Sequence, residues 1–186
     1  MKKITLILSM ALFMMACGNG QQQNEQSASS STAESAALPT TDAFKTDLIV
    51  VLDAYFELKD ALVQTDAVSA SEKAVALAEA IDSVDSQGLS AEAAMLWDVA
   101  GKDAHAAALA ISEETDVEVQ REHFEPLSNV FIDMVKSYGP FSHVIYIQRC
   151  PMVRGGNADW LSKEENVMNP YHGSRMLTCG SVIERI

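Results

Sequence analysis

The chain has 186 residues, of which 48% are hydrophobic and 21% are charged, and this is the composition of a globular domain rather than of a disordered chain. Its length suits one ordinary domain with additional segments. The formal net charge of −13 disfavours nucleic acids and anionic membrane surfaces as partners, because both are themselves negatively charged.

The N-terminal residues are predicted to be a targeting signal rather than part of the fold. Lys2 and Lys3 precede an apolar run, residues 4–15, that is too short to span a bilayer. The run closes with Met-Met-Ala-Cys17, which resembles the signal of bacterial lipoproteins. We therefore expect a signal peptide over residues 1–16 and acylation of Cys17, for example with palmitate. An ordinary signal peptide with an incidental cysteine, or an uncleaved anchor, is the alternative.

A lipid on Cys17 would place the chain in the envelope of a Gram-negative bacterium, anchored to a membrane and facing the periplasm. Residues 17–41 are rich in Gln, Ser, Ala, Asn and Thr and contain little that can be buried. Such a composition predicts a disordered tether between the anchor and the folded part of the chain.

Residues 42–139 are predicted to form four amphipathic helices. In the first, at about residues 42–64, apolar residues recur at three- and four-residue steps. A capping box at Ser69–Glu72 is expected to open the second helix, and Ser90 is expected to cap the third. Short connections favour an antiparallel four-helix bundle, so the expected fold class is mainly α.

The fourth helix is predicted to begin at a second capping box, Thr115–Glu118, and to run to about Tyr138. Pro126 lies inside it. Because proline lacks a backbone N–H and its ring crowds the preceding turn, we expect this helix to bend or split there.

Residues 140–186 differ in character and are predicted to be a loop-rich segment packed on the bundle as part of the same domain. The β-branched and aromatic run 143–148 predicts a strand. Gly155-Gly156 and Asn169-Pro170 are expected to break the following chain into loops. Residues 177–183 form a candidate returning element, so one or two short strands are expected.

The two cysteines of this tail, Cys150 and Cys179, admit two interpretations. In an oxidising envelope they form a candidate disulfide. Alternatively, they are metal ligands, because Met152 follows Cys150 by two residues, Met176 precedes Cys179 by three, and His172 lies between the two pairs. Thiolate, thioether and imidazole groups together select Cu(I) or another thiophilic ion.

Sequence signatures of catalysis are not found. The chain contains no nucleophile elbow, no phosphate-binding glycine loop and no zinc-protease helix motif. We therefore expect no enzymatic activity, no catalytic residues and no cofactor other than the metal ion.

Several separated motifs resemble a family of uncharacterised envelope domains. In chain order they are Tyr146-Ile-Gln-Arg-Cys-Pro-Met152, Asp159-Trp-Leu-Ser162, Asn169-Pro-Tyr-His-Gly173 and Cys179-Gly180. Domains of this family occur as small lipoproteins and as appendages of the periplasmic adaptor subunits of copper, silver and other heavy-metal efflux pumps. The resemblance covers about residues 42–186.

Residues 150–152, Cys-Pro-Met, are also similar to an element of small heavy-metal-binding domains, although Val153 stands here where that element continues with His-Pro. Together these resemblances imply an envelope lipoprotein that binds a soft metal ion, foremost Cu(I), and buffers it or delivers it to an efflux system. The alternative is a metal-free domain, stapled by a disulfide, that docks on an efflux adaptor or on another envelope protein.

Overall fold

The computed structural model describes residues 37–153 and 155–186, and these residues belong to one compact unit. The expected signal peptide over residues 1–16, the lipidation site Cys17 and most of the expected tether lie outside the described residues. The last residues of that tether are described, and there the backbone N–H of Leu38 donates to the carbonyl of Ser137 at 2.9 Å.

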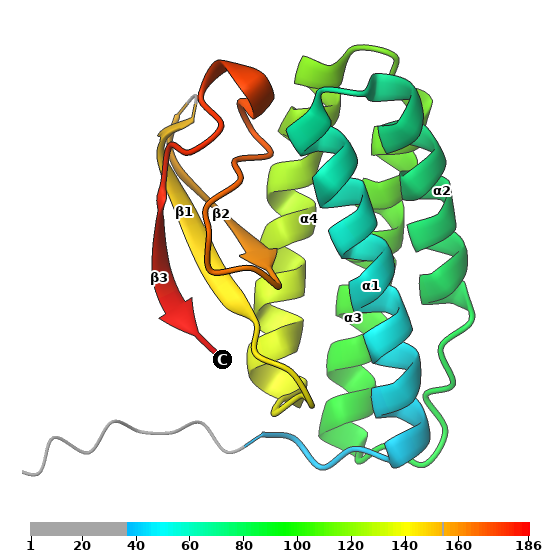
Figure 1. Cartoon of the computed structure of the whole chain (residues 1–186). Helices are drawn as coiled ribbons and strands as arrows, with labels where there is room; N and C mark the ends of the chain where they lie inside the picture. The colour runs from blue at the N-terminus through cyan, green and yellow to red at the C-terminus, as the bar shows by residue number, and fades with distance from the viewer. Residues whose placement is uncertain (1–36, 154) are drawn as a thin grey trace, which may run out of the picture. The chain divides into compact units, whose positions relative to one another are not determined.

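Four helices form the larger part of the unit, as the apolar periodicity predicts (Figure 1). Each helix packs against the next along the chain, and successive helices run in opposite directions. No helix in the described part of the chain is both long and apolar enough to cross a membrane. The helices are α1 (Asp42–Gln64), α2 (Ala67–Asp82), α3 (Ala91–Glu113) and α4 (Val117–Tyr138).

Two of the expected N-caps are wrong, Ser69 by three residues and Thr115 by one, whereas Ser90 caps α3 as predicted. Asp66 caps α2, and its carboxylate accepts the N–H of Ser69, which lies within the helix. Asp116 likewise caps α4. In both cases the aspartate immediately before the first helical residue offers the acceptor that an N-cap position favours. Pro126 does not split α4, which is continuous from its first residue to its last.

The C-terminal tail forms a three-stranded antiparallel sheet in the order β2-β1-β3. This is one strand more than the largest number expected, because the segment after Gly155-Gly156 pairs with β1 instead of forming a loop. The tail contains β1 (Tyr146–Val153), β2 (Gly156–Ser162), the single 3₁₀ turn η1 (Gly173–Arg175) and β3 (Ser181–Arg185).

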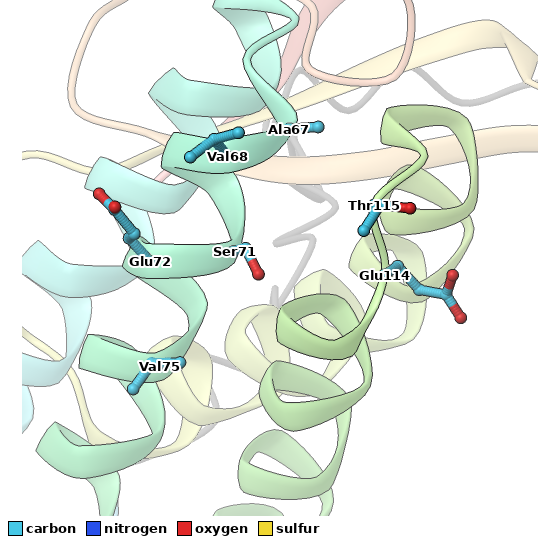
Figure 2. Close-up of a pocket in the computed structure, with 7 residues that line it drawn as sticks. All are labelled: Ala67, Val68, Ser71, Glu72, Val75, Glu114 and Thr115. Atoms are coloured by element: carbon cyan, nitrogen blue, oxygen red, sulfur yellow. The ribbon is translucent and has the colours of Figure 1, made fainter.

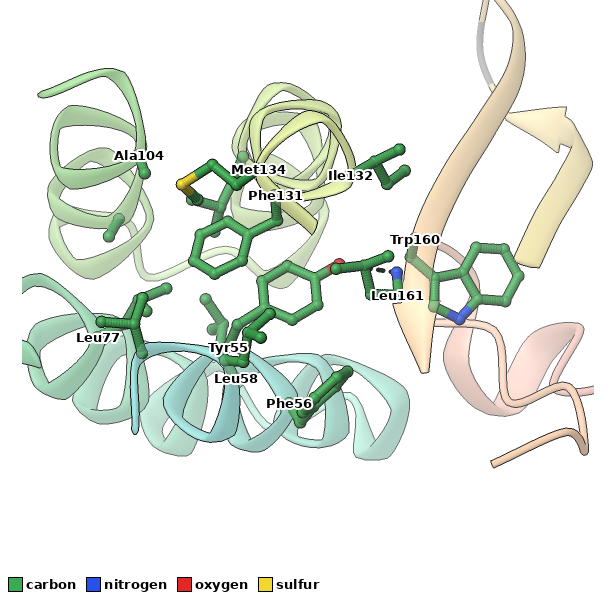
Figure 3. Close-up of a cluster of buried hydrophobic side chains, with 14 of the residues drawn as sticks. Tyr55, Phe56, Leu58, Leu77, Ala104, Phe131, Ile132, Met134, Trp160 and Leu161 are labelled. Atoms are coloured by element: carbon green, nitrogen blue, oxygen red, sulfur yellow. Dashed lines mark hydrogen bonds between the residues drawn. The ribbon is translucent and has the colours of Figure 1, made fainter. Parts of the chain in front are cut away.

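Tyr55 of α1 joins the bundle to the sheet. Its ring stacks between Phe124 and Phe131 of α4, with centroid separations of 5.4 and 4.5 Å. The phenol oxygen lies 2.8 Å from the hydroxyl of Ser128 and accepts the backbone N–H of Leu161 at 3.2 Å (Figure 3). Because these polar groups are buried and mutually satisfied, they fix β2 against α1 and α4 at a defined register.

The two faces of the sheet are both covered. Residues directly opposite each other on paired strands share a face, so Ile147 and Leu161 point toward the helices, whereas Gln148 and Trp160 point away from them. Trp160 is nevertheless fully buried, because the chain between β2 and β3 folds over this outer face. The outer face carries the cysteines.

Candidate functional site

Cys150 lies on the outer face of β1, two residues beyond Gln148 and opposite Ala158 of β2. Its side chain is fully buried. Cys179 lies two residues before β3, is half-buried and packs against the hydrophobic core that includes Cys150. Both cysteines are free thiols, and they are close enough for their side chains to interact. The structure therefore brings together the two sulfur atoms that the sequence separates by 29 positions.

The environment of Cys179 favours the protonated thiol. Burial raises the pKa of the Cys179 thiol, and the neighbouring Cys150 raises it further through a hydrogen bond and its charge. A thiol with a raised pKa is a poor nucleophile at neutral pH. A metal ion bound by Cys179 would have to displace a proton that is held more firmly than usual.

Backbone contacts hold Cys179 in place. The side-chain amide of Asn169 donates to the carbonyl of Cys179 at 2.7 Å, and the N–H of Cys179 donates to the carbonyl of Met176 at 3.0 Å. Gly180 follows with φ of +142°, and a Cβ atom there would lie 2.7 Å from the carbonyl oxygen of Arg149. Only glycine permits this close approach, which seats Cys179 beside β1.

The other predicted ligands fall into two places. Met176 lies within one turn of Cys179, as its spacing suggests. Met152 and His172 instead line a cavity of about 680 Å³ between α4 and the tip of the β1–β2 hairpin, and neither cysteine lines this cavity. Nε2 of His172 lies 3.1 Å from the carbonyl oxygen of Met152. Since a carbonyl can only accept, Nε2 carries a proton there, and in the neutral imidazole Nδ1 would be the acceptor.

The side chains that accompany the two thiols limit which metal ions the thiols could bind. Among residues 37–153 and 155–186, no three or more His, Cys, Asp and Glu side chains are grouped in a way that could hold a metal ion. His172 is therefore not grouped with the two thiols, and the thioether next to Cys179 in sequence is that of Met176. Two thiolates and a thioether form a soft set, which favours Cu(I) over harder cations.

Arg121 of α4 joins the tail to the bundle. Its Nε donates to the carbonyl of Pro170 at 2.7 Å, and one terminal nitrogen donates to the carbonyl of Leu62 at 2.8 Å. The guanidinium group also pairs with Glu118, and so does Arg175 of the tail. Although burial acts to raise it, these two arginines lower the pKa of Glu118 below its ordinary value. The anchored carbonyl precedes Tyr171 and His172, so Arg121 positions one wall of the cavity.

Asn169 and Gly173 are the positioning residues that sequence reasoning treated only as loop punctuation or motif members. The carboxamide oxygen of Asn169 accepts the N–H groups of Tyr171 and His172 at 2.8 and 3.2 Å. Gly173 has φ of +51°, and a Cβ atom there would overlap Arg121. An Asn-Pro pair is a turn signal, and a glycine stands three residues after it, so the sequence did indicate this anchored turn.

Comparison with known proteins identifies the helical part of the chain. Residues 51–143 match the family described as "Protein of unknown function (DUF3347)", and the chain belongs to this family. The match runs from within α1 to the residues just before β1, so the cysteines lie outside it. No curated protein and no solved structure matches the chain.

Proposed function

We propose that the protein binds a soft metal ion, foremost Cu(I), through the thiolates of Cys150 and Cys179, and that it buffers the ion or hands it to an efflux system. The observation that supports the proposal is the juxtaposition of two free thiols on the covered face of the sheet. Met176, which accepts a hydrogen bond from the backbone of Cys179, is the proposed thioether ligand. Soft sulfur donors of this kind select Cu(I) and other thiophilic ions.

In this proposal, Met152 and His172 are the residues that first bind the incoming ion. Met152 is 59% exposed, whereas Cys150, two residues earlier in β1, is fully buried. An ion arriving from solvent can reach an exposed thioether and the acceptor nitrogen of an imidazole without prior movement of the tail. Transfer to the thiols then requires the loss of their protons, which makes retention of the ion dependent on pH.

A Cu(I) titration tests the proposal on the compact unit, residues 35–186. The protein is purified anaerobically, its free thiols are counted after denaturation, and Cu(I) is titrated against a competing chromophoric chelator. We expect two free thiols and one bound Cu(I), with affinity reduced at least about 100-fold in Cys150→Ser because a principal ligand is lost. Met168→Leu, which removes an exposed thioether from the same tail, is the matched control and should bind as the parent does.

The opposite outcome favours the metal-free alternative. If both thiols are oxidised to a disulfide that resists mild reduction, and if no copper is retained, the tail is a stapled structural element that shapes an interaction surface for an adaptor or another envelope protein. Retention of Cu(I) that is unchanged in Cys150→Ser would also contradict the proposal, because it would place the ion elsewhere.

We further propose that Cys17 carries the lipid that holds this unit at the periplasmic side of a membrane. The support is the sequence of residues 1–17 alone. Fractionation of cells that express the full chain, with mass spectrometry of the N-terminal peptide, tests it. Cys17→Ser should leave an unacylated protein, and acylation that persists in this variant would contradict the assignment.

A further inference from the structure

A second surface of the protein lies on α2 and does not involve the thiols. Between α2 and the connection from α3 to α4 there is an open groove of about 340 Å³, shown in Figure 2. Val68 and Val75 form its apolar wall, and these side chains are 71% and 43% exposed. The groove is at the small end of the range for ligand pockets, so it suits a few aliphatic side chains rather than a large cofactor.

The groove is set by the fold rather than by mobile side chains. Gln120 of α4 is fully buried, and its amide nitrogen donates to the carbonyls of Ala67 and Glu114, both at 2.9 Å. Ala67 belongs to one wall and Glu114 to the other. Because one buried side chain holds both walls together, binding would lose little free energy to ordering them.

The charge around the groove is of one sign. Glu72 and Glu114 are the charged residues that line it, and Figure 2 shows their carboxylates on the outer sides of the two walls. Lys73 is adjacent to Glu72 in sequence, but its ammonium group pairs with Glu57 of α1 at 2.7 Å. An apolar wall with carboxylates at its borders complements aliphatic side chains that are flanked by lysine or arginine.

We propose that this groove docks an amphipathic helix of a partner protein, with aliphatic residues on one face and basic residues at its borders. A helix is the fitting shape because the valines lie seven residues apart along α2, so the apolar wall follows a helix axis for about 10 Å. Figure 1 places α2 on the side of the bundle away from the sheet, so such a partner would not cover the tail that carries the thiols. Docking in this groove would not depend on metal binding at the thiols.

Fluorescence anisotropy with a defined probe tests the inference. The probe is a labelled helical peptide of leucine and lysine, about 18 residues long so that it can form a helix, and its counterpart carries glutamate in place of lysine. We expect the basic peptide to bind residues 35–186 and the acidic peptide not to bind. Binding should weaken about fivefold in Val68→Ser and about tenfold in Glu72→Lys, and it should weaken further as salt is raised.

Val99→Ser supplies the matched control, because Val99 is a 56% exposed valine on α3 that does not line the groove. It should bind the basic peptide as the parent does. Equal binding of the two peptides, no binding of the basic one, or binding indifferent to Val68→Ser would overturn the inference. Sedimentation velocity adds one further arm: a homodimer that Val68→Ser dissociates would show that the occupant is a second copy and would also overturn it.

Discussion

Arg121 offers the most direct test of how the tail is attached to the bundle. The side chain is only 4% exposed, and Arg121→Met would leave the carbonyls of Leu62 and Pro170 without their charged donor. It would also leave Glu118 with Arg175 as its remaining arginine partner. Leaving a buried acceptor without its donor costs about 1–3 kcal/mol, so the two carbonyls together cost about 2–6 kcal/mol. This is a large share of the roughly 5–15 kcal/mol by which most domains are stable.

Urea unfolding followed by circular dichroism measures this loss, and thermal unfolding should show a fall in Tm of roughly 10 °C. The control is Arg175→Met, which removes the other arginine that pairs with Glu118 but is 58% exposed, so its cost should not exceed about 1 kcal/mol. Arg121→Lys should recover less than half of the loss, since an ammonium group cannot reproduce the guanidinium fork. Costs for Arg121→Met and Arg175→Met that agree within about 1 kcal/mol would refute the reasoning.

Four further results are expected. In urea unfolding, Gly173→Ala should lower the free energy of unfolding by at least about 2 kcal/mol, because its Cβ would overlap Arg121 at a positive φ. Gly155→Ala has open space around it and should cost only about 1 kcal/mol of backbone strain, and equal costs for the two variants would contradict this. Burial raises the pKa of Tyr55, so its native state stays protonated while the unfolded chain ionises. The contribution of Tyr55 to the free energy of unfolding is therefore fully present below about pH 10 and should fall by about 1.4 kcal/mol per pH unit above it. A pH dependence that is unchanged in Tyr55→Phe would contradict this prediction. Cu(I) affinity should rise with pH, by up to about tenfold per unit for each thiol that must lose a proton, and a flat profile in the chelator competition would argue against thiolate ligands. Met152→Leu should slow Cu(I) uptake in stopped-flow mixing while changing the equilibrium affinity less than about threefold, and a large loss of affinity would instead make Met152 a principal ligand.

The helices could be predicted from the sequence because each buries one apolar stripe. The expected span of the first helix, residues 42–64, coincides with α1. The starts of α2 and α4 were displaced because serine and threonine capping boxes competed with Asp66 and Asp116, and the aspartates prevailed. Capping preferences differ by too little for the sequence to decide between neighbouring candidates.

The tail was harder to predict because tertiary contacts decide its structure. β2 begins with residues of low strand propensity, yet Trp160 and Leu161 are buried on its two faces and hold it in the sheet. Gly155 and Gly156 both have positive φ, so the paired glycines mark the turn of a hairpin rather than an open loop. The strand propensity of β2 alone could not predict its place in the sheet, because burial under the segment between β2 and β3 stabilises the strand.

The predicted metal ligands lie in two different places of the fold for a similar reason. Spacing along the chain correctly placed Met176 one turn from Cys179, but two-residue alternation could not anticipate the irregular register of β1 between Cys150 and Val153. Met152 consequently lies at the cavity with His172. The juxtaposition of the two thiols, by contrast, depends on the whole tail folding back across the sheet.

X-ray absorption spectroscopy of the Cu(I)-loaded protein tests the central claim most directly, because it reports which atoms surround the ion. We predict a first shell of sulfur, with two thiolates from Cys150 and Cys179 and the thioether of Met176, and a sulfur count that falls by one in Met176→Leu. A first shell dominated by nitrogen or oxygen, or a spectrum unchanged in Cys179→Ser, would contradict the account.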